Sequence, residues 1–137
     1  MLYLDSSALA KLYVAEPGSD EVRALMEANR GRLFTSVATW AEVLSALARC
    51  RRENRFSTRE YRLQQRAFSS DWSALHAIEV ALPVLAPAEH LIELYALRAY
   101  DAIQLCSALW IGRPVFACFD ERLRRAAAAE GLSVAPQ

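Results

Sequence analysis

The chain has few residues that interrupt or cross-link a fold. Its 137 residues include only four glycines, five prolines and three cysteines. The odd number of cysteines argues against a disulfide framework, and their spacing matches no zinc-binding or redox motif. A reduced, cytoplasmic setting is therefore the simplest expectation, with a hydrophobic core in place of cross-links.

Long apolar runs are also absent. No run approaches the roughly 18 residues that a membrane-spanning helix needs. Near the N-terminus, Asp5 and Lys11 interrupt the stretch that a signal peptide would keep apolar. Because no linker, repeat or low-complexity segment divides the chain, we expect a single domain over residues 1–137 with no membrane association.

Neither sign of charge is in excess, since 16 basic and 16 acidic residues give a net charge of zero. This balance argues against a general nucleic-acid coat protein, which would be basic overall. The basic residues are nevertheless concentrated, with seven arginines and only two acids between Arg49 and Arg66. This segment is a candidate surface for RNA phosphates or for an acidic partner, or it is a solvated helix face. The candidate contact residues are Arg55, Arg59 and Arg62.

Short apolar runs alternate with longer segments of helical periodicity. The runs predict strands at about 2–4, 33–35, 76–80, 115–118 and 133–135. The periodic segments predict helices at about 6–14, 19–29, 36–52, 57–68, 87–97, 99–111 and 120–130. Strands that alternate with helices imply crossover connections and a parallel sheet. We therefore predict an α/β fold, a three-layer α/β/α sandwich with a four- or five-stranded, mainly parallel sheet.

Four carboxylates stand in otherwise apolar stretches, and this is the most informative feature of the sequence. An ionised carboxylate that is buried without a partner costs several kcal/mol. A divalent cation such as Mg²⁺ or Mn²⁺, which prefers oxygen ligands, would compensate all of them together. The four are Asp5, Glu42, Asp101 and Asp120.

Each of these acids also has a structural interpretation. Asp5 and Asp120 follow predicted strands and are placed to cap the next helices. Glu42 could pair with a distant arginine, and Asp101 could mark the polar edge of a buried helix together with Gln104. The metal hypothesis therefore depends on the set: Asp5 and Asp120 would meet at one edge of a parallel sheet, where ligand sites form.

The segments around the four acids resemble a known family, the PIN-domain ribonucleases of the VapC toxin group. Each motif alone is common, but their order and spacing agree over essentially the whole chain. The four segments are Leu4–Leu9 with its continuation through Ser19, Ser36–Val43, Leu97–Leu105 and Phe119–Leu123.

The resemblance implies roles for individual residues. The acidic quartet of the family falls on Asp5, Glu42, Asp101 and Asp120, and the small hydroxyl residue that supports the metal site falls on Ser7. One departure is Cys118, which stands where the family usually has Thr or Ser. Because a thiol is a weaker donor than a hydroxyl, we expect the local geometry around Asp120 to differ from that of the family.

The resemblance also implies an activity and partners. Such proteins are Mg²⁺- or Mn²⁺-dependent endoribonucleases that cut tRNA or rRNA as toxins of toxin–antitoxin pairs. They usually form homodimers, and a small VapB-type antitoxin wraps each subunit and covers the active site.

Three other interpretations remain. The chain could be a PIN nuclease of RNA processing without an antitoxin, which the absence of a small neighbouring open reading frame would favour. It could be a catalytically silent module that binds RNA or protein. A phosphotransfer or phosphatase domain is disfavoured, because Ser7 replaces the second acid of the Asp-x-Asp pair that such phosphatases use.

Overall fold

The first apolar run of the chain forms the central strand of a parallel sheet. The computed structural model describes residues 1–137, and its five strands lie in the order β3-β2-β1-β4-β5. All four strand pairs are parallel, so every connection is a crossover through helices. The strands are β1 (Leu2–Leu4), β2 (Leu33–Ser36), β3 (His76–Ile78), β4 (Val115–Ala117) and β5 (Ser133–Ala135).

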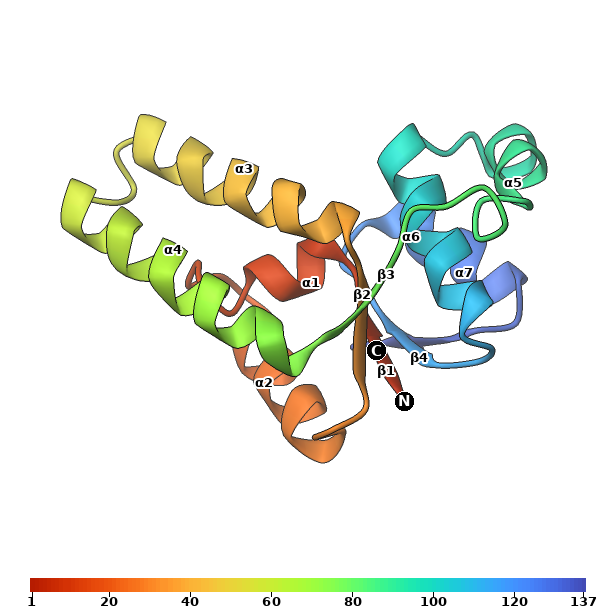
Figure 1. Ribbon diagram of the computed structural model, residues 1–137, viewed down its shortest axis with the longest axis horizontal. Helices are drawn as coiled ribbons and strands as arrows, with labels where there is room; N and C mark the ends of the chain where they lie inside the picture. Colours follow the sequence, from red (N-terminus) through yellow and green to blue (C-terminus); the bar gives the residue numbers. More distant parts are fainter.

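Helices cover both faces of this sheet, which gives the predicted three layers (Figure 1). The first face carries α1 (Ser6–Ala10), α2 (Ser19–Ala28), α3 (Ala38–Arg52) and α4 (Thr58–Asp71), followed by a short 3₁₀ turn at Trp72–Ala74. The second face carries α5 (Ala88–Tyr95), α6 (Ala99–Trp110) and α7 (Glu121–Ala129). No helix has the length and apolar character that crossing a bilayer would require.

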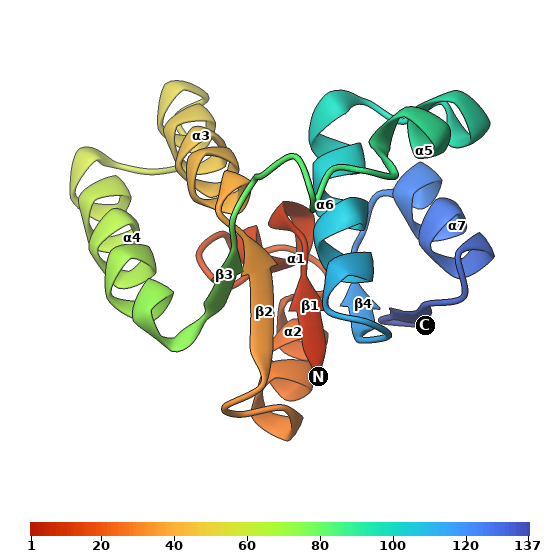
Figure 2. The same cartoon turned by 45° about the vertical axis from the view of Figure 1, so that its right-hand side comes forward.

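The alternation of β1 explains why both layers are needed. Leu2 and Leu4 are fully buried in one hydrophobic cluster, with residues of α1 to α4. Tyr3 points the other way, into a second cluster with residues of α5 to α7. A strand whose side chains alternate between two faces must be covered on both. Figure 2 shows the sheet between the two groups of helices.

The predicted elements are confirmed, and their boundaries differ by a few residues. The largest difference is α1, which ends at Ala10, whereas the sequence predicts a helix to about Val14. Beyond Ala10 the backbone tightens into turns, since Lys11 N bonds to Ala8 O. The Ser19 hydroxyl also donates to the Lys11 carbonyl at 2.8 Å, which satisfies an acceptor that a longer helix would have used.

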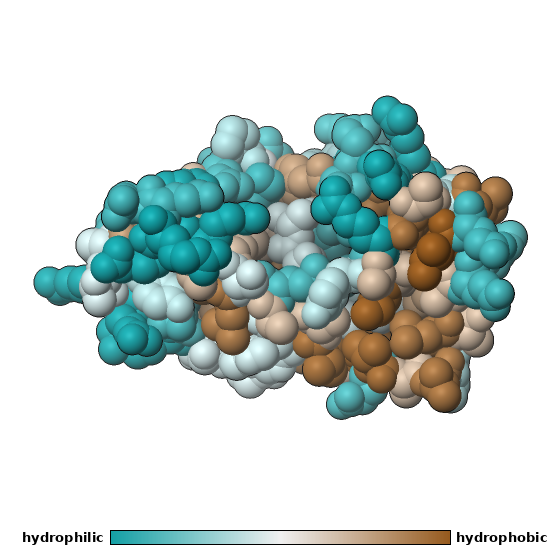
Figure 3. Space-filling view, turned by 90° about the horizontal axis from the view of Figure 1, so that it is seen from above, coloured by the Kyte–Doolittle hydropathy of each residue, from teal (hydrophilic) through white to brown (hydrophobic).

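The carboxyl ends of the strands meet at one edge of the sheet. Leu4 of β1 is paired with Ala117 of β4, so Asp5 and the residues after Ala117 leave neighbouring strands at the same level. Figure 3 looks down on this edge, where the molecule is hollowed between a hydrophilic side over α3 and α4 and a side with more hydrophobic residues over α5 and α6. The topology therefore places a candidate site in this hollow.

Candidate active site

Asp5 is the buried centre of the candidate site. Its side chain caps α1, because Asp5 Oδ1 accepts from Ala8 N at 2.8 Å. Only 3% of Asp5 is exposed. Burial raises the pKa of the carboxyl from 3.8 to about 6, although the bond from Ala8 and others favour the ionised form. The capping and functional interpretations of Asp5 are thus compatible, since the cap uses one oxygen.

Ser7 joins Asp5 to the end of β4. Its Oγ lies 2.8 and 3.0 Å from the two Asp5 oxygens, and it accepts from Phe119 N at 2.9 Å. Cys118 is fully buried beside it, and its Sγ accepts from Asp120 N at 3.3 Å. The thiol sulfur therefore accepts the hydrogen bond of the Asp120 backbone amide, and the effect of Cys118 on the site stays a prediction.

Glu42, on α3, is held by a buried network from α6. Gln104 Nε2 donates to Glu42 Oε2 at 2.7 Å and to Thr39 Oγ1 at 2.8 Å. The hydroxyl of Tyr3 in turn donates to Gln104 Oε1 at 2.7 Å. Burial raises the pKa of Glu42, partly offset by the Gln104 bond, and the nearby charge of Asp101 raises it further.

Asp101 and Asp120 complete the set from the opposite side. Asp101 lies in the first turn of α6 and is partly buried. Its pKa is raised by burial first and then by the charge of Asp120, against smaller effects of the Arg98 backbone and charge. Asp120 is exposed and caps α7, since its Oδ1 accepts from Leu123 N at 2.9 Å.

None of these four carboxylates forms an ion pair, because every ion pair of the molecule involves other acids. The charge of each carboxylate raises the pKa of a neighbour: Glu42 acts on Asp5, Asp101 on Glu42, and Asp120 on Asp101. No three acidic, histidine or cysteine side chains are gathered closely enough to form a ready-made metal cluster. Mg²⁺ needs only one or two direct carboxylate ligands and keeps several waters, so a spread set of uncompensated oxygen donors fits this ion.

A groove of about 690 Å³ adjoins the carboxylates between α1 and α3. Ser6, Ser7 and Glu42 contribute to its wall, and Tyr100 and Phe119 supply aromatic rings. An elongated substrate that reached the carboxylates could therefore continue along this groove.

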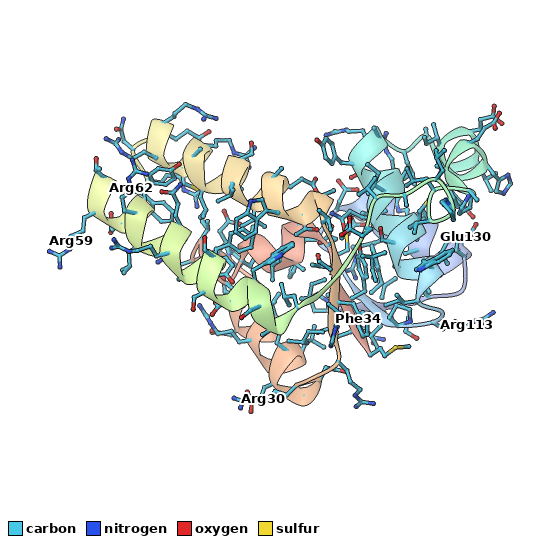
Figure 4. All side chains as sticks on the ribbon, viewed as in Figure 1. Arg30, Phe34, Arg59, Arg62, Arg113 and Glu130 are labelled. Carbon is cyan, nitrogen blue, oxygen red and sulfur yellow. The ribbon has the colours of Figure 1, made fainter.

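The three candidate arginines lie in different places. Arg55 lines the groove and forms an ion pair with Glu16, in which Arg55 Nη2 lies 3.1 Å from Glu16 Oε1. Arg59 and Arg62 belong to α4, and Figure 4 shows both at the outer end of the α3–α4 pair, away from the sheet. Their role in RNA or partner binding stays a prediction.

The sequence did not identify Gln104 as part of the site. Gln104 is 1% exposed and hydrogen-bonds both to Tyr3 of the central strand and to Glu42. These two partners lie 101 and 62 residues away from Gln104 in the chain. The only signal was a polar residue three positions after Asp101 on an otherwise apolar helix.

Sequence comparison places the chain beside known nucleases. A family model described as "PIN domain" matches residues 2–129. Ribonuclease VapC45 of Mycobacterium tuberculosis is 36% identical over 138 residues, which cover 99% of this chain and 95% of that protein.

Solved structures with low sequence identity share the fold. FitAcB from Neisseria gonorrhoeae superposes with a TM-score of 0.72 at 16% identity, covering 98% of this chain and 96% of that chain. A toxin–antitoxin complex from Klebsiella pneumoniae superposes with a TM-score of 0.69 at 20% identity, and the match covers 99% of this chain and 97% of that chain.

Proposed function

The chain belongs to the PIN-domain family, with close similarity to VapC ribonucleases, and from that premise we propose that it is a metal-dependent endoribonuclease. The observation that carries the proposal is the set of uncompensated carboxylates at the carboxyl edge of the sheet. Asp5, Glu42 and Asp101 all have raised pKa values, and none of them forms an ion pair. A divalent cation would compensate the negative charge of such a site, and the bound cation could in turn bind a phosphodiester.

We propose that the metal ion is bound by carboxylate oxygens of this set. Asp5 and Asp101 would be the direct ligands, and Glu42 and Asp120 would complete the site through waters or accept a proton. When bound, Mg²⁺ or Mn²⁺ would make a water more acidic and offset charge on the phosphate. Gln104 and Ser7 would hold the Glu42 and Asp5 carboxylates in place, and the raised pKa of Asp5 would fall once a cation replaced the missing partner.

The biological setting is proposed from the relatives. VapC45 is named a ribonuclease, and one structural neighbour is a toxin–antitoxin complex. We propose that this chain is likewise the toxin of such a pair, that a VapB-type antitoxin binds it, and that it acts as a homodimer. Its RNA substrate would be tRNA or rRNA, which it would meet in the cytoplasm.

The test is cleavage of total tRNA and rRNA by purified, antitoxin-free protein. Discrete products should appear with Mg²⁺ or Mn²⁺ and disappear with EDTA. Products of equal yield in EDTA would contradict metal dependence. Folded protein that binds RNA but produces no cleavage under any condition would favour the catalytically silent module.

A further inference from the structure

A half-buried arginine on α7 connects two strand ends next to the candidate site. Arg124 Nη1 donates to the Cys118 carbonyl at 2.7 Å, and Arg124 Nη2 donates to the Pro136 carbonyl at 2.7 Å. A longer bond of 3.3 Å joins Nη1 to the Ala135 carbonyl. Because Cys118 follows β4 and Ala135 ends β5, one guanidinium links the carboxyl ends of these two strands.

The geometry of α7 explains how Arg124 reaches these carbonyls. Arg124 lies four residues after Asp120, the N-cap of α7, and its backbone amide donates to the Asp120 carbonyl at 2.9 Å. Side chains lean toward the N-terminus of a helix, so the Arg124 side chain points back toward the residues that precede α7. The helix dipole disfavours a cation near this end, and the carbonyl oxygens compensate that cost.

The Cys118 carbonyl belongs to the turn that presents Asp120. The Cys118 amide donates to the Ala135 carbonyl at 3.0 Å, and Cys118 Sγ accepts from Asp120 N at 3.3 Å. With Arg124 on its carbonyl, the amide, the carbonyl and the sulfur of Cys118 all form hydrogen bonds. The turn between β4 and α7 is therefore held from the side of β5.

Asp120 has one carboxylate oxygen that this turn leaves free. Asp120 N donates to Cys118, the Asp120 carbonyl accepts from Arg124 N, and Asp120 Oδ1 accepts from Leu123 N. Oδ2 forms no hydrogen bond within the protein. The charge of Asp120 raises the pKa of Asp101, so the two carboxylates face the same site. The position of the free oxygen thus depends on the turn that Arg124 holds.

Arg124 has neither an acidic partner nor a place in the groove. No ion pair of the molecule includes Arg124, and Arg124 is not among the residues that line the groove between α1 and α3. Contact with a substrate phosphate in the groove is therefore disfavoured. Its guanidinium binds carbonyl oxygens instead, and a planar, rigid fork of donors fixes their relative positions.

We propose that Arg124 is a positioning residue of the metal site. It holds the Cys118 carbonyl and so keeps the free oxygen of Asp120 where it helps to hold the ion, while the end of β5 holds Arg124 in turn. Replacing a residue that supports a metal ligand commonly weakens metal binding roughly 10- to 100-fold. This inference rests on the proposed nuclease function, because it concerns the metal of that site.

The test measures Mn²⁺ binding in the absence of RNA, from the decrease of the electron paramagnetic resonance signal of free Mn²⁺. Asp120→Asn keeps a residue that can cap α7 but removes the charge, so it should weaken binding roughly tenfold or more. Arg124→Gln should weaken binding about 3- to 10-fold, because it displaces the carboxylate without removing it. Arg124→Lys, which keeps a cation with donor groups, should restore part of the affinity. Wild-type affinity of Arg124→Gln would overturn the proposal.

Two control variants separate positioning from stability. Arg125→Gln changes the neighbouring arginine, which is exposed and lies 3.8 Å from Glu121, and it should leave the Mn²⁺ affinity unchanged. Leu132→Val removes a methylene from the buried cluster directly before β5, so it should lower the urea midpoint of unfolding but not the Mn²⁺ affinity. Equal losses of affinity in Leu132→Val and Arg124→Gln would overturn the proposal, because reduced stability would then explain both.

A double-mutant cycle tests whether Arg124 acts through Asp120. In the Asp120→Asn background, Arg124→Gln should cause little further loss of Mn²⁺ affinity. The same fold-loss in both backgrounds would overturn the proposal, because Arg124 would then act independently of Asp120.

Failure of this inference can be distinguished from failure of the proposed function. Wild-type protein that neither binds Mn²⁺ nor cleaves RNA would contradict the nuclease function. Wild-type protein that does both, with no effect of Arg124→Gln on Mn²⁺ binding, would contradict the role of Arg124 alone.

Discussion

The side-chain amide of Gln104 donates to Glu42 Oε2 at 2.7 Å and so connects α6 with α3 above the sheet. The two helices cover opposite faces of the sheet and meet at its carboxyl edge. The same side chain accepts from the Tyr3 hydroxyl on the central strand. One buried glutamine thus holds a carboxylate of the site relative to the core of both layers.

Replacing Gln104 with leucine should affect both stability and activity. The change keeps the volume but leaves the Tyr3 hydroxyl without its buried acceptor, which costs roughly 1–3 kcal/mol. The free energy of unfolding in urea should fall by that amount, and the cleavage rate should fall because Glu42 loses its donor. Gln64→Leu is the control, since Gln64 lies on α4 and forms no side-chain hydrogen bond. Equal stability of the two variants would count against the network.

The stability of the metal-free protein should depend on pH through Asp5. Between about pH 4 and 6 the unfolded chain releases the Asp5 proton while the folded protein keeps it, so the free energy of unfolding falls as pH rises. Above about pH 6 the penalty reaches roughly 3 kcal/mol. Asp5→Asn should remove this part of the pH dependence and stabilise the metal-free protein at neutral pH.

The measurement is the difference between wild-type and Asp5→Asn unfolding curves from pH 4 to 7, in EDTA. Using the difference removes the contributions of Glu42 and Asp101 except for the part that comes from their coupling to Asp5. Asp20→Asn, at an exposed position of α2, should give a curve parallel to the wild type. A parallel curve for Asp5→Asn would show that its carboxyl titrates normally.

Cys118 should be replaceable by serine but not by alanine. A serine hydroxyl can accept from Asp120 N as the thiol does at 3.3 Å, whereas alanine leaves this amide without a side-chain acceptor. Cys118→Ser should retain cleavage near the wild-type rate, and Cys118→Ala should reduce it several-fold. If both variants cleave at the same rate, the sulfur does not position Asp120.

Gly18 should tolerate alanine much less well than Gly31. Both have positive φ angles, +95° and +75°, so both substitutions share a backbone cost of about 1 kcal/mol. Only at Gly18 would a Cβ collide with the Phe119 ring, while Gly31 has open space. Thermal or urea unfolding should therefore show Gly18→Ala to be about 1–3 kcal/mol less stable than Gly31→Ala. Equal stabilities would mean that the ring moves freely.

Local sequence patterns predicted the helices and strands well, but they did not predict contacts between residues that are distant in the chain. The apolar run Leu2–Leu4 predicted the first strand, and the position of Asp5 after it predicted the edge of the sheet at which Asp5 lies. The central position of that strand became known only from the strand order of the structure. The partner of Glu42 could not be predicted, because Gln104 reaches it only through the packing of α6 against α3. Likewise, a run of arginines does not show that Arg55 faces a groove while Arg59 lies at the outer end of α4.

The central claim is that RNA cleavage requires a divalent cation held by Asp5 and Asp101. The most direct test measures the cleavage rate of one RNA against Mn²⁺ concentration for wild type, Asp101→Asn and the exposed control Asp20→Asn. The account predicts that wild type and Asp20→Asn follow the same saturating curve, and that Asp101→Asn loses most activity while remaining folded. Metal-dependent cleavage by Asp101→Asn at the wild-type rate would contradict it.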